Sequence, residues 1–219
     1  MKQMTTACRA LLLAAGATLI ATLAGAQAAQ TPPTEPLQGS WRFSASAGAF
    51  VPRSALILAA DGHNTELAAG PHFSLDVQYL ATKHAAVYAD ASTNFSTIFL
   101  GSSIRPTVVG PSNQVMLVGG TTGVLVSLPT SDHLQVTLRL GGGFKWYSFD
   151  LTDAQDQWRP TGDIGLGLRG VGAGPIEVTM EVRYLPSSFD QGKLPIRGIA
   201  PQAQRQNDLL VAIGVSIRP

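Results

Sequence analysis

The sequence has little charge, a single cysteine and no long apolar segment beyond its first residues. Charged residues make up 13% of the 219-residue chain, whereas about a quarter is usual for a globular domain. A nucleic-acid-binding protein would show an excess of basic residues, and the formal net charge of +1 argues against that class. Cys8 lies in a segment that we expect to be removed, so the mature chain has no disulfide and no cysteine metal site.

The first 26 residues have the order of regions found in a secretory signal peptide. A cationic start with Lys2 and Arg9 precedes the apolar run LLLAAGATLIATL, and small residues follow at the spacing of a cleavage site. We expect cleavage after Ala26 or Ala28, and a mature protein whose N-terminal sequence begins at Met1 would contradict this. Residues 27–39 form a Pro-rich lead-in, and residues 40–219 form the folded domain.

Motifs for catalysis, nucleotide binding and metal binding are also missing. None of the four histidines has metal-ligand spacing, and no GxSxG, HExxH, CxxC or Walker-type loop occurs. The Gly-rich stretches GLGLRG and GGTTG lie inside expected strands, which favours packing over phosphate binding. Asp150, Asp153 and Asp156 do not match an EF-hand, so we interpret them as a solvated acidic loop. The sequence therefore predicts no cofactor and no metal.

What the sequence does contain is eight segments with period-two alternation. Their length is close to the ~9–11 residues that a tilted strand needs to cross a bilayer. They cover residues 40–51, 72–81, 86–95, 114–128, 134–146, 161–170, 176–185 and 207–218.

The connections between these segments alternate between long and short. Residues 52–71, residues 97–113, SFDLTDAQDQW and PSSFDQGKLPIRGIAPQAQRQ are long, whereas TKHA, PTSDH and GVGAG are short. An up-and-down meander with tight turns at one end and extended loops at the other produces this order. It is the layout of an outer-membrane barrel. We therefore predict an all-β fold, an eight-stranded antiparallel up-and-down transmembrane β-barrel.

The stretch LQVTLRLGGGFKW, from Leu134 to Trp146, indicates which face points outward. Leu138 and Leu140 share one parity with the aromatics at its end, and Arg139 and Lys145 share the other. Apolar faces this continuous suit hydrocarbon, so we expect the leucines to face lipid and the cations to face the lumen. Aromatics fall near the strand ends, where interfacial belts place Trp and Tyr: Phe73, Phe95, Trp146, Trp158 and Tyr184 at the loop end, Trp41 and Tyr79 at the turn end.

The remaining parity gathers charges of both signs, which must pair inside a narrow lumen. The predicted structural network consists of Asp76, Asp90, Arg139, Asp163, Arg169, Glu177, Glu181 and Arg183, with Arg42 and Lys145 on the same face. Equal spacing from a turn at Lys83 places Asp76 opposite Asp90, and we expect Arg139 to neutralise them, with Glu181 as a further partner.

A turn centred on Ala173 predicts the register of residues 161–170 against residues 176–185. In this register Arg169 faces Glu177 and Asp163 faces Arg183, whereas a register two residues away would break both charge pairs. On the lipid side the same register places Leu166 opposite Met180.

The segment GPHFSLDVQYLATKHAAVYADAST resembles the second hairpin of the OmpA/OmpX-like outer-membrane β-barrel family, and NDLLVAIGVSIRP resembles its last strand. The resemblance covers residues 40–219 and rests on pattern. It implies a bacterial outer-membrane protein whose partners are outer-membrane lipids, lipopolysaccharide and the barrel-assembly machinery, with extracellular loops that contact a partner the sequence does not identify. Family members usually end in an aromatic residue, whereas this chain ends in Arg218-Pro219.

The function expected from this interpretation is structural or surface-interacting, without catalysis. One alternative is a soluble periplasmic lipocalin-like barrel that binds a small apolar ligand, with its apolar face inside. Another is a lipid A-modifying enzyme that uses His72 and Ser74, which share a parity at a loop-end position.

Overall fold

The computed structural model describes residues 38–56, 64–99, 114–131, 133–150, 154–170, 175–193 and 203–218. The expected signal segment and most of the Pro-rich lead-in lie outside these ranges. Among the described residues, no helix has the length and apolar character needed to cross a membrane.

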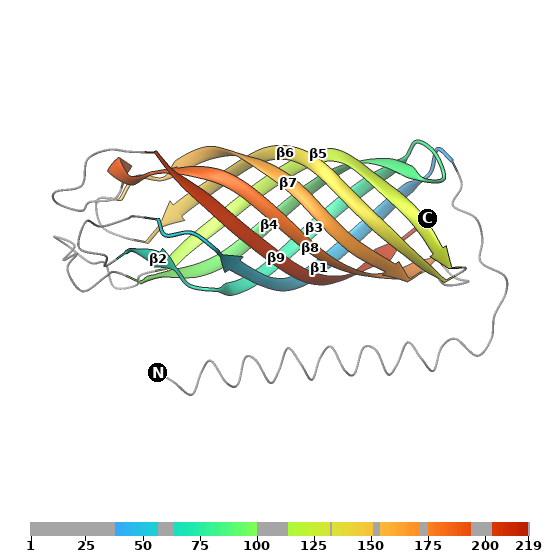
Figure 1. Ribbon diagram of the computed structural model, residues 1–219, viewed down its shortest axis with the longest axis horizontal. Helices are drawn as coiled ribbons and strands as arrows, with labels where there is room; N and C mark the ends of the chain where they lie inside the picture. Colours follow the sequence, from blue (N-terminus) through green and yellow to red (C-terminus); the bar gives the residue numbers. More distant parts are fainter. Residues whose placement is uncertain are drawn as a thin grey trace, which may run out of the picture.

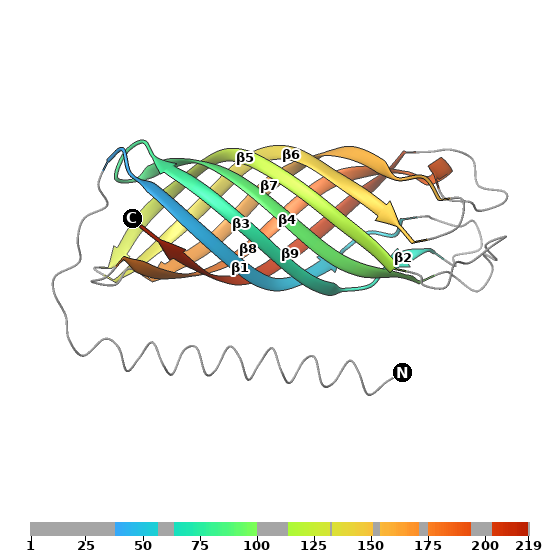
Figure 2. The same ribbon diagram turned by 180° about the vertical axis from the view of Figure 1, so that it is seen from behind.

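Eight long antiparallel strands close into a barrel (Figures 1 and 2). Neighbours along the chain pair in order, and β1 also pairs with β9, which closes the sheet and removes its free edges. A short strand β2, Glu66–Leu67, pairs with the end of β4, and a 3-10 turn, Gln191–Lys193, follows β8. The long strands are β1 (Trp41–Pro52), β3 (Gly70–Leu80), β4 (Ala85–Phe99), β5 (Gln114–Ser131), β6 (Leu134–Phe149), β7 (Gln157–Gly170), β8 (Ile176–Asp190) and β9 (Ala203–Ile217).

Several strands extend further at the loop end than the alternation predicts. The segment 186–206 was expected to be a loop, yet β8 continues to Asp190 and β9 begins at Ala203. The ladder between them persists as Ser188 pairs with Arg205 and Phe189 pairs with Gln204. Beyond the apolar band the outward residues become polar, so the period-two signal fades although the hydrogen-bonded ladder continues.

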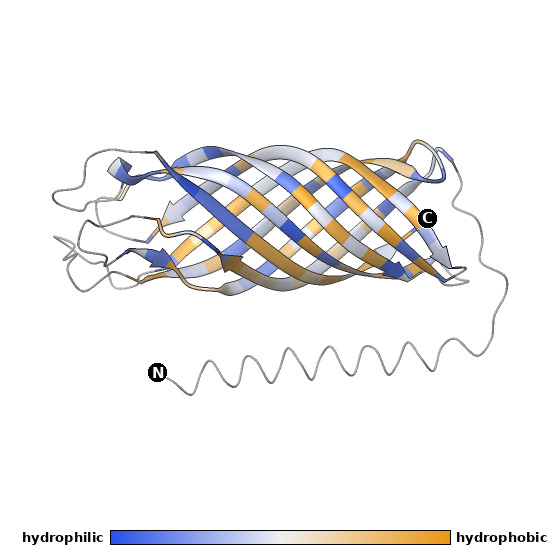
Figure 3. Ribbon diagram, in the orientation of Figure 1, coloured by the Kyte–Doolittle hydropathy of each residue, from blue (hydrophilic) through white to orange (hydrophobic). Residues whose placement is uncertain are grey.

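Side chains alternate between an apolar outer wall and a polar interior. Figure 3 shows the corresponding alternation of hydrophobic and hydrophilic residues along the strands. In β6 the outward Leu140 is 66% exposed, whereas its neighbour Arg139 is 6% exposed and Lys145 is buried inside. The predicted orientation of this strand is therefore confirmed. A soluble lipocalin-type barrel would have the opposite arrangement, with its apolar side chains inside.

Aromatic side chains pair across strands near both ends of the outer wall. Trp146 stacks on Trp158 at the loop end, with ring centroids 5.7 Å apart. Trp41 contacts Tyr79 at the turn end, with centroids 5.1 Å apart. These positions match the predicted interfacial belts.

Two of the predicted pairings in the barrel have different outcomes. Asp76 lies directly opposite Asp90 in the β3–β4 ladder, as the equal spacing from Lys83 predicts. The predicted β7–β8 register is wrong by two residues, because Leu166 pairs with Val182 and not with Met180. Both registers keep the apolar residues outside, so the apolar pattern could not distinguish them.

Candidate functional site

The centre of the lumen is organised around the carboxylate of Asp163, which is fully buried. Its Oδ2 accepts hydrogen bonds from Arg139 Nε and Arg183 Nη2, both at 2.8 Å, and its Oδ1 accepts one from Arg183 Nε at 3.1 Å. Tyr88 Oη and Thr121 Oγ1 also donate to Oδ2 at 2.9 Å. A buried charge is tolerated only when it is paired and hydrogen-bonded, and this carboxylate satisfies both conditions.

The direct pairing of Asp163 with Arg183 that the sequence predicted does not occur, yet the two side chains form an ion pair. Arg183 lies opposite Gly165, two residues from Asp163 along β7. A long guanidinium side chain reaches a diagonal neighbour, so the argument that a two-residue shift would break the pairs was wrong. The same holds for Arg169, which lies opposite Thr179 but still approaches Glu177 to 3.7 Å.

Glycines make room for this cluster at specific places. Gly165 lies between Arg139 on β6 and Arg183 on β8, and a Cβ there would meet both side chains at 3.2 Å. Gly141 lies opposite both Gly123 and Asp163, and its missing Cβ would lie 2.2 Å from Tyr88 Oη. The lumen packing proposed for the glycines of GLGLRG is therefore seen at Gly165.

The side chain of Tyr88 lies over Gly123 and Gly141, which have no side chains of their own. It lies opposite Gly123 in the ladder between β4 and β5, and its hydroxyl reaches Asp163 on β7. Its ring also faces the guanidinium of Arg139, with Arg139 Cζ 3.7 Å from the centroid. The sequence prediction does not include Tyr88, although Tyr88 shares the parity of Asp90 in the segment AVYAD.

Three further carboxylates surround Arg139 in this central layer. Its Nη1 lies 3.1 Å from Asp76 and 3.8 Å from Glu181, and its Nη2 lies 3.8 Å from Asp90. Arg183 contributes a second contact to Asp90 at 3.0 Å. The structure thus brings Asp76, Asp90 and Glu181 to Arg139. With Asp163 these make four carboxylates against the two arginines Arg139 and Arg183, so the central layer has a formal charge of −2.

A second layer, at the turn end, has the opposite charge. Glu177 is buried among three arginines, with Arg42 Nε and Arg218 Nε both at 3.0 Å and Arg169 more distant. Three arginines against one glutamate give this layer a formal charge of +2.

Gln78 connects the turn-end layer to the central layer. Its Oε1 accepts from Arg169 at 3.0 Å and from Arg42 at 3.3 Å, and its Nε2 donates to Asp76 at 2.6 Å. The +2 and −2 layers are therefore in contact through one amide, and their charges cancel across the pair of layers.

The loop end of the interior differs from the sequence prediction because it is mostly apolar. Lys145 pairs with Asp208, and Gln206 Nε2 donates to Asp208 Oδ1 at 3.0 Å. Beyond this pair, Leu56 from the segment after β1 is fully buried, and Leu56 N donates to Thr65 O at 2.8 Å. The apolar cluster that fills the mouth contains Phe50, Leu56, Leu67, Ile98, Val115, Leu117, Tyr147, Leu185, Phe189 and Leu210.

Asp208 and this apolar cluster could have been found from the sequence. Asp208 shares the inward parity of Ala212, and so does Leu210. The prediction that inward residues are polar along the whole barrel does not account for the change to apolar side chains near the loops.

His72 and Ser74 do not form a nucleophile–base pair. Both are buried in the lumen. His72 Nδ1 lies 2.7 Å from Asn94 Oδ1, and Ser74 Oγ lies 2.7 Å from Ser46 Oγ. Among the described residues, no group of His, Cys, Asp or Glu has the arrangement of a metal site. Asp153 lies outside the described residues, and Asp156 accepts hydrogen bonds from Ser148 Oγ and Phe149 N.

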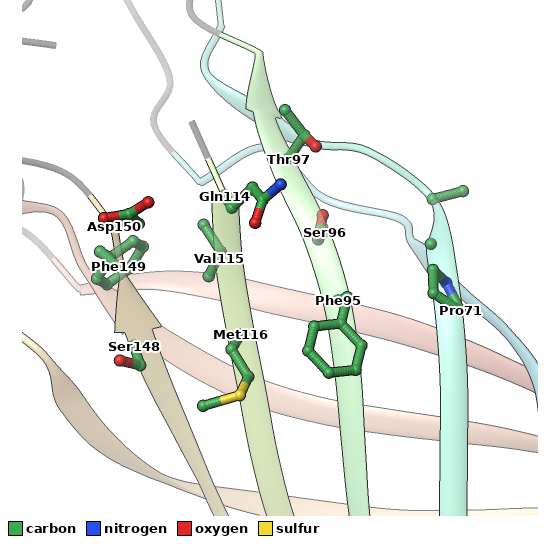
Figure 4. A pocket seen from close by; sticks show the side chains of 12 residues that line it. Pro71, Phe95, Ser96, Thr97, Gln114, Val115, Met116, Ser148, Phe149 and Asp150 are labelled. Atoms are coloured by element: carbon green, nitrogen blue, oxygen red, sulfur yellow. The ribbon is translucent and has the colours of Figure 1, made fainter. Parts of the chain in front are cut away.

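A cleft of about 640 Å³ opens at the loop-end rim, across the ends of β3, β4, β5 and β6 (Figure 4). Phe95, Met116 and Pro71 provide its apolar side, and Gln114 and Asp150 its polar side. Two cavities lined by lumen residues are far smaller, about 30 Å³ beside Arg139 and about 10 Å³ beside Arg42. The interior is therefore closely packed around these two arginines.

Comparison with solved structures identifies the fold. Neisserial surface protein A (NspA) superposes with a TM-score of 0.53 at 12% identity, over 82% of this chain and 97% of that chain. OprG from Pseudomonas aeruginosa gives a TM-score of 0.45 at 11% identity, over 83% of this chain and 98% of that one. Ail, the attachment invasion locus protein of Yersinia pestis, gives 0.43 at 13% identity, over 83% and 100%.

No protein-family model matches the chain, and neither does any curated protein. At these identities the structural likeness shows the fold alone, which is that of eight-stranded outer-membrane β-barrels.

Proposed function

We propose that this protein is an outer-membrane anchor that presents its long loops to the cell exterior as an interaction surface, without catalysis. The observation that carries the proposal is the filled interior. A +2 layer, a −2 layer, the Lys145–Asp208 pair and the apolar cluster follow one another from the turn end to the loop end. An eight-stranded barrel is barely wide enough for its own side chains, so the barrel serves as a support and not as a pore.

Conductance tests the sealed interior. Purified protein in a planar bilayer should give no stepwise conductance at moderate voltage. Discrete channels with porin-like conductance would overturn the proposal, because a continuous aqueous path would then cross the packed layers. The matched control is Phe50→Ala with Phe189→Ala, which removes two large side chains from the apolar cluster and leaves the charged layers in place.

The assignment of the long connections to the cell exterior has a test of its own. Arg197 lies in a long connection and is followed by Gly198, whereas Lys83 lies in a short turn. Trypsin added to intact cells should cleave after Arg197 and leave the bond after Lys83 intact until the outer membrane is permeabilised. Cleavage after Lys83 in intact cells would mean that the orientation is reversed.

The interaction role is tested by exchanging loops. Replacing residues 100–113 and 194–202 with two-residue turns should leave a folded, heat-modifiable barrel that has lost the adherence of the full chain to host-cell monolayers. The matched control carries the same two segments with scrambled sequences, so that length and composition are kept. Unchanged adherence of the trimmed barrel, or no adherence of the full chain, would contradict an interaction surface in these loops.

A further inference from the structure

The outer wall of the barrel carries very little positive charge, and what it carries is concentrated at one place. Among the strand residues that the structure describes, Arg205 is the one lysine or arginine with an exposed side chain. Arg53 directly follows β1 and is also exposed. β1 and β9 are neighbours, and Val51 lies opposite Leu209, so the two guanidinium groups project from adjacent strands at the loop end.

Arg53 is held in place by backbone contacts to β9. Its own N–H donates to Asn207 O at 2.7 Å, and the next residue, Ser54, accepts from Asn207 N at 3.1 Å through its hydroxyl. Arg205 lies two residues from Asn207, on the same face of the same strand. The two arginines are therefore diagonal neighbours on either side of Asn207, about 7–8 Å apart at their backbones. Side chains of this length converge readily on one group between them.

Neither guanidinium has a carboxylate within ion-pair distance among the described residues. By contrast, Arg159 at the same end of the barrel pairs with Asp190 at 3.1 Å. Asn207 adds a neutral donor to the pair, because its Oδ1 accepts from Tyr184 Oη at 2.7 Å while its amide group remains on the outer face. The site thus offers two guanidinium groups and one amide donor, and none of the described carboxylates pairs with either arginine.

The depth of this site matches a membrane headgroup. Outward residues of β9 are apolar from Leu209 to Ile217, close to the length that crosses the hydrocarbon core. Figure 3 shows the loop-end part of β9 as a hydrophilic stretch that gives way to a hydrophobic one further along the strand. Tyr184 marks the boundary, since Trp and Tyr favour the interface. Arg53 and Arg205 therefore lie at the level of lipid phosphates.

We propose that Arg53, Arg205 and Asn207 bind a phosphate of lipid A, the phosphorylated glycolipid of the outer leaflet. Guanidinium groups bind phosphate in a bidentate manner, with charge-assisted hydrogen bonds. The long-loop end faces the outer leaflet in barrels of this layout. Below the arginines, the outward side chains of β1 are the small residues Ala45, Ala47 and Ala49, between larger apolar side chains of β3 and β9. An acyl chain of the bound lipid lies along this strip.

Retention of lipid by the full mature protein tests the inference, which rests on the membrane placement in the proposed function. Protein folded in detergent is mixed with hexa-acyl lipid A, the same lipid A without phosphates, or phosphatidylglycerol, and the complexes are counted by native mass spectrometry. The wild type should retain phosphorylated lipid A. Arg53→Gln with Arg205→Gln should weaken retention at least roughly tenfold, since each charge-assisted contact is worth about that factor.

The matched control, Lys83→Gln with Lys193→Gln, removes the same charge elsewhere and should retain lipid A like the wild type. Equal retention by the arginine double variant, or equal retention of the phosphate-free lipid or of phosphatidylglycerol by the wild type, would overturn the site. Alkaline carbonate extraction separates this failure from that of the proposed function. A protein released from membranes fails the proposed function, whereas an integrated protein without lipid A preference fails only this inference.

Discussion

Asp163 illustrates how a narrow lumen can hold many charges. Its two oxygens accept five hydrogen bonds from four side chains, of which two are arginines. Arg139 in turn is shared by four carboxylates. Each charged group therefore depends on several partners, and removing one partner leaves the others buried and uncompensated. Such losses cost far more than the exchange of a surface pair.

Arg139→Ala should lower the free energy of unfolding by about 3–5 kcal/mol, because it leaves Asp76 and Asp90 as neighbouring buried carboxylates with less compensation. Urea titration of the protein in lipid vesicles measures this value. Lys83→Ala, which removes an exposed cation from a short turn, serves as the control and should stay within about 0.5 kcal/mol. A loss below about 1 kcal/mol for Arg139→Ala would contradict a central role for this residue.

Gly141→Ala should destabilise the barrel by about 1–3 kcal/mol through overpacking. The added methyl group would lie 2.2 Å from Tyr88 Oη and 2.3 Å from Thr122 O, so Tyr88 would have to leave Asp163. Gly170→Ala is the matched control, because its Cβ would meet Val178 O at an ordinary 3.7 Å. Equal stability of the two variants in urea titration would show that Tyr88 does not need the space above Gly141.

At the level of elements, the β7–β8 hairpin is where sequence reasoning failed. The apolar residues define the lipid face, and the strands, their order and the Asp76–Asp90 pairing followed from alternation and turn lengths. The register of β7 on β8 did not, because shifts of two residues keep every side chain on its face. The choice is made by packing in the lumen, where Gly165 must lie between Arg139 and Arg183. This packing involves three strands, so it cannot be recognised in the sequence of any single segment.

Cross-strand disulfides test the observed register. Leu166→Cys with Val182→Cys places the two residues directly opposite each other, within the usual Cα separation of a disulfide, about 4.4–6.8 Å. It should oxidise readily in the folded barrel. Leu166→Cys with Met180→Cys, a diagonal pair in this register, should remain reduced under the same conditions. The reverse pattern in thiol titration would restore the register with Asp163 opposite Arg183.

For the whole molecule, the sequence revealed the outer wall better than the interior. Strands in contact with lipid have apolar residues at every second position, and this pattern is easily recognised in the sequence. The interior changes from charged to apolar along the barrel axis. Each strand contributes only every second residue to it. Phe50, Leu185 and Leu210 belong to three different strands, and only the closed sheet brings them together as a cap over the charged layers.

Membrane placement predicts that the cost of a charge on the outer wall depends on its depth. Leu138 lies near the middle of β6 and Leu134 at its turn end, and both face outward. Leu138→Arg should cost about 2–4 kcal/mol on folding into bilayers, whereas Leu134→Arg should cost about 0–1 kcal/mol. Folding titrations in vesicles measure both values. Equal costs at the two depths would mean that this face does not lie against a bilayer.

The most direct test of the central claim, a barrel with its apolar face in lipid and a closed interior, is fluorescence quenching at two neighbouring strands. A Cys8→Ser chain carrying Leu138→Cys is labelled with a small fluorophore, and Ser127→Cys on β5 serves as the inward control at a similar height. The label at position 138 should be quenched by doxyl lipids and not by aqueous iodide, and position 127 should react poorly with the label in the folded protein. Quenching of position 138 by iodide but not by doxyl lipid would contradict the account.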